Sequence, residues 1–195
     1  MSVLPDHSLP ISSPDQIDDQ ILRELYGYWS GLRVAGKRVS RSDIDPIDIP
    51  HLLPYIILAE CYDAGQRIKF RLTGSDIAFV QGSDLTGRYL HERGPRTPYL
   101  EHLSELYRIG AISEDGVYSA FCYGYTEEEG PKKVNRIFLP LDGQGEGPPM
   151  LLVGQVRDKT VPTARPIWLT EPNHIEPIAL FTIEPPMHQQ ATRQA

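Results

Sequence analysis

The chain has 195 residues, of which 40% are apolar and 23% charged, and its formal net charge at pH 7 is −7. These values are ordinary for one globular domain of roughly 150 residues with extensions, so they exclude a disulfide miniprotein, a disordered chain and a coiled-coil rod. The acidic balance argues against a dedicated nucleic-acid binder, which would normally carry a basic footprint.

The two cysteines, Cys61 and Cys122, form no Cys-x-x-Cys motif, which suits a reducing compartment. The first residues lack the basic and apolar regions of a signal peptide, and the longest apolar stretch is far shorter than the ~20 residues that a membrane span needs. We therefore expect a cytoplasmic protein whose partners include neither nucleic acid nor membrane.

Prolines gather at both ends of the chain. This composition predicts a flexible N-terminal extension over 1–14, a domain over 15–160 and a proline-rich C-terminal extension over 161–195. The domain begins with an amphipathic helix. Ser13 and Pro14 form its expected start, apolar residues recur every three or four positions, and Gly36 is its expected end.

Two strands are predicted next, over 55–61 and 67–73, joined by a turn. In the second of them Ile68, Phe70 and Leu72 alternate with basic residues, which is typical of a half-buried strand. Two short helices follow, one ending at Gly82 and one running from Thr97 to Gly110. Strands over 117–126, 134–141 and 150–156 complete an α+β domain with an antiparallel sheet, one face of which the middle helices cover.

Several segments of the chain carry a family resemblance. They are Leu25-x-x-x-Trp29, Asp43-x-Asp45-Pro46, Ile49-Pro50-x-Leu52-Leu53-Pro54, Phe70-Arg71-Leu72-Thr73-Gly74-Ser75 and Asp84-Leu85-Thr86-Gly87-Arg88. In their order along residues 22–156 they resemble bacterial stand-alone PAS-like proteins. The resemblance implies a five-stranded antiparallel sheet cradling short helices. It also implies a sensory or protein-interaction module for signal transduction, commonly dimeric, whose output comes from a separate partner protein.

PAS domains bind small ligands or cofactors between sheet and helices, and here the resemblance leaves the cofactor unknown. If the fold is right, a set of apolar and aromatic side chains converges in that space. Two interpretations stay open: an ordinary packed core, or a pocket of ~300 Å³ that holds a small apolar ligand with tyrosine hydroxyls as orienting groups. The residues concerned are Phe70, Leu72, Phe79, Tyr89, Leu103, Tyr107, Phe121, Tyr123 and Phe138.

The first helix is the expected homodimer interface, because its stripe is rich in the aromatic residues that are enriched where proteins meet. The residues that we assign to this interface are Leu25, Tyr28, Trp29 and Leu32. The alternative is that the stripe packs on the chain's own sheet.

No catalytic or metal-binding motif stands out, so we do not expect an enzyme or a metal site. His91 and His102 lie where some PAS domains hold haem, but neither sits in a haem-binding pattern. Two other functions stay open. A scaffolding protein could add residues 178–183 of its proline-rich tail to a neighbour as a strand. A small-ligand enzyme would need a buried carboxylate with a shifted pKa, such as Asp76 or Asp84.

Overall fold

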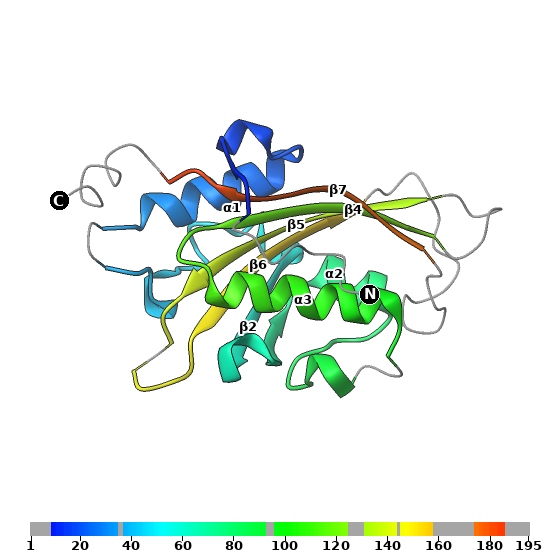
Figure 1. Ribbon diagram of the computed structural model, residues 1–195. Helices are drawn as coiled ribbons and strands as arrows, with labels where there is room; N and C mark the ends of the chain where they lie inside the picture. Colours follow the sequence, from blue (N-terminus) through cyan, green and yellow to red (C-terminus); the bar gives the residue numbers. More distant parts are fainter. Residues whose placement is uncertain are drawn as a thin grey trace.

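One mixed sheet organises the molecule, with its strands in the order β1-β7-β4-β5-β6-β2-β3 (Figure 1). The computed structural model describes residues 9–34, 37–92, 96–124, 131–143, 145–157 and 174–185. Neighbouring strands are antiparallel except β1 and β7, which pair in parallel. The strands are β1 (Ile11–Ser12), β2 (Ile56–Tyr62), β3 (Arg67–Thr73), β4 (Val117–Gly124), β5 (Lys132–Leu141), β6 (Met150–Arg157) and β7 (His174–Ile183).

Helices cover both faces of this sheet, with α1 on one side and α3 on the other (Figure 1). The α-helices are α1 (Gln20–Gly31), α2 (Ser75–Gln81) and α3 (Pro98–Ile112). Short 3-10 turns connect the larger elements: η1 (Pro14–Gln16), η2 (Arg41–Asp43), η3 (Leu53–Tyr55), η4 (Asp63–Gly65) and η5 (Leu90–Glu92).

The alternation of side chains along β5 explains how one sheet supports two cores. Val134 and Phe138 belong to the cluster beneath α3, whereas Ile137 and Leu139 belong to the cluster beneath α1. Because successive residues of a strand point to opposite faces, a central strand with both faces covered is apolar almost throughout. The sheet is therefore the shared wall of two separate apolar layers.

The α+β class is confirmed, but the expected sheet of five antiparallel strands is wrong: there are seven strands and one parallel pair. The additional strands, β1 and β7, come from the stretches that composition assigned to extensions. For β7 the sequence indicated only residues 178–183, as a strand added to a neighbouring chain. The strand begins at His174, pairs with β4 of the same chain and contains Pro177 at an irregularity in that register, where proline normally argues against a paired strand. The boundaries at 14 and 160 themselves stay predictions.

The first helix also differs from its expected limits. Ser13 and Pro14 begin only the 3-10 turn η1. The helix α1 begins at Gln20, and Asp19 caps it by accepting a hydrogen bond from the Leu22 amide with its carboxylate. The helix ends at Gly31, before the expected stop; Gly36 lies outside the described residues. The stripe is nevertheless real, and the chain's own sheet buries it.

Gly110 does not end α3, which continues to Ile112. A Cβ atom at Gly110 would lie 2.7 Å from the Cβ atom of Phe138 on β5. The glycine is therefore required where the helix comes closest to the sheet, rather than as a terminator. Gly82, by contrast, ends α2 as expected, in the left-handed conformation with a φ of 66°.

Candidate functional site

A row of buried polar side chains crosses the sheet face beneath α3. Ser119 on β4 pairs in register with Arg136 on β5, which pairs with Gln155 on β6. The three residues are 2%, 1% and 5% exposed. Their neighbours on the same face, such as Phe121 and Phe138, are apolar and buried. Polar groups in such a place cost free energy unless hydrogen bonds or another function compensate for it.

Arg136 is the centre of this row. Its Nε atom donates a hydrogen bond of 2.8 Å to Oε1 of Gln155, and its Nη2 atom donates one of 2.8 Å to the hydroxyl of Tyr99 on α3. The guanidinium carbon lies 5.3 Å from the centre of the Phe121 ring. The remaining nitrogen, Nη1, is buried and has no hydrogen-bond partner among the described residues.

His102 lies one turn beyond Tyr99 on α3 and packs edge-on against Phe121, with ring centres 4.6 Å apart. Burial, and after it the Arg136 charge, lowers the pKa of His102 to about 4 against the opposing effect of Glu105. The imidazole is therefore neutral at pH 7 and adds no charge to the site. Its Nε2 atom is buried and has no hydrogen-bond partner in the described part of the chain.

The first turn of α3 forms the roof of the site. Thr97 caps the helix by accepting a hydrogen bond from the Leu100 amide, and Pro98 occupies the first helical position. Tyr99 follows and reaches the guanidinium of Arg136 with its hydroxyl. The Tyr99 hydroxyl thus links the first turn of α3 to the buried guanidinium.

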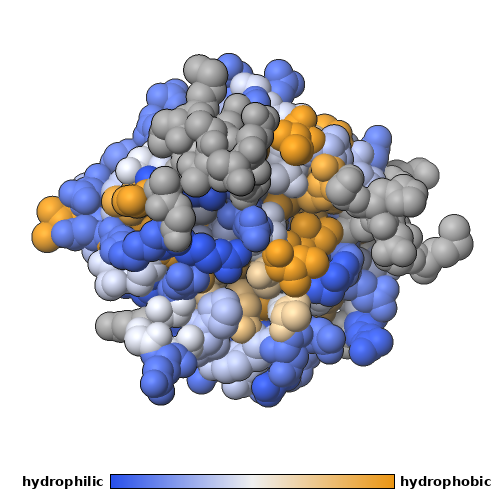
Figure 2. Space-filling model, turned by 60° about the vertical axis from the view of Figure 1, so that its left-hand side comes forward, coloured by the Kyte–Doolittle hydropathy of each residue, from blue (hydrophilic) through white to orange (hydrophobic). Residues whose placement is uncertain are grey.

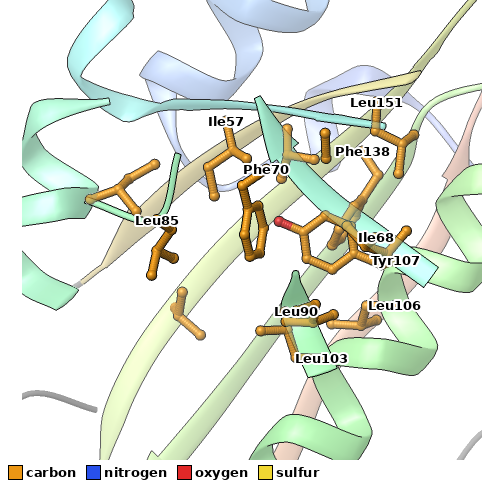
Figure 3. Close-up of a cluster of buried hydrophobic side chains, with 14 of the residues drawn as sticks. Ile57, Ile68, Phe70, Leu85, Leu90, Leu103, Leu106, Tyr107, Phe138 and Leu151 are labelled. Atoms are coloured by element: carbon orange, nitrogen blue, oxygen red, sulfur yellow. The ribbon is translucent and has the colours of Figure 1, made fainter. Parts of the chain in front are cut away.

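Most of the predicted ligand-binding side chains do come together beneath α3. Figure 3 shows part of this cluster, with Tyr107 of α3 beside Phe70 and Phe138 of the sheet. Tyr107 meets both rings edge-on, at centre distances of 6.0 and 5.2 Å. The predicted residues within the cluster are Phe70, Leu103, Tyr107, Phe121, Tyr123 and Phe138. Whether they bind a ligand stays a prediction.

The structure places the other three predicted lining residues elsewhere. Phe79 on α2 is 84% exposed, and Tyr89 is half-buried against His91 and Lys69. Leu72 is 38% exposed because β3 and β2 lose register: Ala59 pairs with Phe70, and its neighbour Leu58 pairs with Leu72. The additional residue, Arg71, turns Leu72 away from the face that Phe70 occupies.

The polar row is what sequence reasoning missed. Its signal was present, because Arg136 shares the parity of Val134 and Phe138 and so must lie on the same sheet face. Tyr99 and His102 are three positions apart in the predicted helix and share its inner side. A charged residue at an inward position of a central strand is the pattern that would have found the site.

The residues predicted for a dimer interface lie along α1. Leu25 and Trp29 are each 1% exposed, and the Trp29 indole donates a hydrogen bond of 3.2 Å to the carbonyl of Pro140. Tyr28 and Leu32 are half-buried at the edge of the same cluster. The chain's own sheet therefore takes up the surface of Leu25 and Trp29, and the dimer stays a prediction.

A cleft of about 390 Å³ lies between α3 and the turns η4 and η5. Its lining includes Gln66, His91, Glu101, Ser104 and Arg108, and none of the nine predicted ligand-binding residues. Leu90 and Leu100 also line the cleft, so its lining is mixed, and it lies apart from the apolar pocket that the sequence suggested.

The structure gives no support to the enzyme alternative. Asp84 lies in an exposed turn, where hydrogen bonds from the hydroxyl and the amide of Thr86 lower the pKa of its carboxyl. A buried acid would show the opposite shift. Asp76 is half-buried in the first turn of α2. Within the described ranges, no group of three histidine, cysteine or acidic side chains is placed to hold a metal ion.

A family model described as "PAS domain" matches residues 17–153, well over half of the chain. The chain belongs to the PAS domain family. No curated protein and no solved structure matches it. The match covers nearly the whole span of the sequence resemblance and includes both helices that face the sheet. This PAS domain is therefore a sensory or interaction module. In the part of the chain that the structure describes, no helix is long and apolar enough to cross a membrane.

Proposed function

We propose that this PAS domain is a small-molecule sensor that binds its ligand between α3 and the sheet and signals through a separate partner protein. The observation that carries the proposal is the polar row of Ser119, Arg136 and Gln155 in an otherwise apolar layer. A core that served stability alone would gain by replacing these groups with well-packed apolar side chains. Their presence beneath α3 supports a binding role.

Association with a second copy and with a partner is part of this proposal. On the face that Figure 2 shows, hydrophilic side chains predominate and apolar side chains gather in separate areas. A dimer contact through α1 would use the outer side of that helix, where Tyr28 and Leu32 keep part of their surface exposed. Exposed large apolar side chains include Phe79, Ile47, Ile11, Val34, Ile112 and Ile178.

The scaffolding alternative loses the strand that was expected to reach a neighbour. Residues 178–183 lie within β7, which pairs with β4 of the same chain, and Phe181 packs on Tyr118 with ring centres 5.0 Å apart. An intermolecular strand would first have to leave this position.

The test is to identify what the protein carries when it is purified. Mass spectrometry after denaturation should release one compound in stoichiometric amount, and light scattering should give twice the mass of the chain. Tyr99→Phe removes a hydroxyl of the site and should reduce the amount released. Tyr89→Phe is the matched control outside the cluster and should release as much as wild type. A wild-type protein that releases no compound, and whose melting temperature no member of a small-molecule library raises, would contradict the proposal.

A further inference from the structure

We infer that Arg136 anchors a small organic monoanion, a carboxylate with an apolar body, beneath the first turns of α3. This inference rests on the proposed function and names the class of ligand. Its starting point is that the guanidinium is buried and uses two of its three nitrogens, both on neutral partners, Gln155 and Tyr99. The third nitrogen, Nη1, meets no acceptor among the described residues.

The site holds a positive charge that nothing in the described structure neutralises. Arginine is charged at every physiological pH, and a buried guanidinium is normally paired with an acid. Both carboxylate oxygens of Glu105, the acid that acts on His102, accept hydrogen bonds from Arg108. His102 is neutral and supplies no compensating charge. An anion is therefore the chemical group that would complete this environment.

The number of groups in the site indicates the kind of anion. One uncompensated charge and one unpartnered nitrogen match a single carboxylate, whereas a phosphate dianion would leave excess negative charge in an apolar layer. The rings of Tyr99 and Phe121 lie against the guanidinium, and the His102 ring packs edge-on on Phe121. They favour an apolar or aromatic body behind the carboxylate.

Four probes test the inference: benzoate and hexanoate, with benzyl alcohol and hexanol as neutral counterparts of similar shape. Calorimetric titration and thermal melting at constant ionic strength should show that wild type binds each carboxylate at least about tenfold more tightly than its alcohol. Arg136→Met should abolish this preference. Arg67→Met removes an exposed charge of the same kind and should keep the preference. Inorganic phosphate should not raise the melting temperature of wild type.

Arg136→Gln, which is neutral but polar, provides a second variant if Arg136→Met fails to fold, and it too should lose the preference. The inference is overturned if the carboxylates bind no better than the alcohols, if either Arg136 variant keeps the preference, if phosphate is the better ligand, or if no probe binds. Binding of the alcohols alone would contradict the anionic ligand but not the proposed function as a small-molecule sensor. The separate result that contradicts the sensor is a purified protein that releases no compound and whose melting temperature no member of the library raises.

Discussion

Among the described residues, the two faces of the sheet bury apolar clusters of equal size, 20 residues each, but the faces differ in the polar side chains that they bury. Beneath α1 the cluster is apolar and includes Trp29. The buried Asp115 beside it is paired with Arg33, whose guanidinium lies over the Trp29 ring. Beneath α3 the buried layer also includes the polar side chains of Arg136, Gln155 and Ser119. The same strands form both faces, so strand propensity cannot explain the difference. We infer that the α1 face serves stability and that the α3 face gives up some stability for binding.

Each helix nevertheless approaches the sheet at a glycine. Beneath α1 the glycine is on the strand: a Cβ atom at Gly154 of β6 would lie 2.7 Å from side-chain atoms of Leu22 and Leu25. Beneath α3 it is on the helix, at Gly110. The close contact on the α1 side is with flexible side-chain ends, whereas Gly110 meets the Cβ atom of Phe138, which cannot move without its strand. The α3 side is therefore the less adaptable of the two contacts.

The largest expected effect is on the α1 face. Trp29→Ala would leave a cavity in the centre of that cluster and remove a hydrogen bond to Pro140. We expect the free energy of unfolding in urea to fall by about 3–5 kcal/mol, with the preference for carboxylates over alcohols unchanged. Phe79→Ala deletes an aromatic ring that is 84% exposed and should change stability by no more than about 0.5 kcal/mol. A folded Trp29→Ala protein that lost the preference for carboxylates would contradict the inference that the α1 face serves stability and the α3 face serves binding.

The next effect tests the contact of α3 with the sheet. Gly110→Ala adds a methyl group where a Cβ atom would lie 2.7 Å from the Cβ atom of Phe138, so the helix must move. We expect a loss of about 1–3 kcal/mol in the free energy of unfolding. Gly27→Ala in α1 is the matched control, because no atom lies within 4 Å of the added methyl group. There the better helix propensity of alanine should raise stability by roughly 0.5–1 kcal/mol. Equal effects of the two substitutions would show that the contact is not tight.

The sequence predicted which apolar side chains share a buried face better than it predicted the polar site around Arg136. Helical and strand periodicity indicated the inward faces that carry Phe70, Tyr107 and Phe138, because periodicity depends on local geometry alone. The PAS resemblance brought these faces into one layer. Leu72 was misplaced by a register shift that depends on how β3 pairs with β2, which no local pattern shows. The unpartnered nitrogen of Arg136 could not be predicted either. Whether an acid reaches it depends on how three strands and a helix meet in the folded chain, and among the described residues none does.

The smallest expected effect is a pH dependence that arises on the α3 face. The folded pKa of His102 is about 4, below its ordinary value of 6.5. Between these values His102 is protonated in the unfolded chain but not in the folded protein, so the free energy of unfolding should fall as the pH drops from about 6.5 towards 4. We expect a contribution on the order of 1 kcal/mol, because the ring is partly open to solvent.

Urea unfolding of wild type and His102→Gln at about pH 7 and about pH 4.5 measures this contribution as the difference between their slopes. Carboxylates with lowered pKa values, such as Glu105, also lose stabilising charge in this range, so only the difference is informative. His102→Gln should have the flatter profile. Arg136→Met should lie between the two, because the Arg136 charge supplies part of the shift and burial supplies the larger part. Parallel profiles of unfolding free energy against pH for all three proteins would mean that folding does not lower the pKa of His102. The layer beneath α3 would then admit water as readily as the surface does.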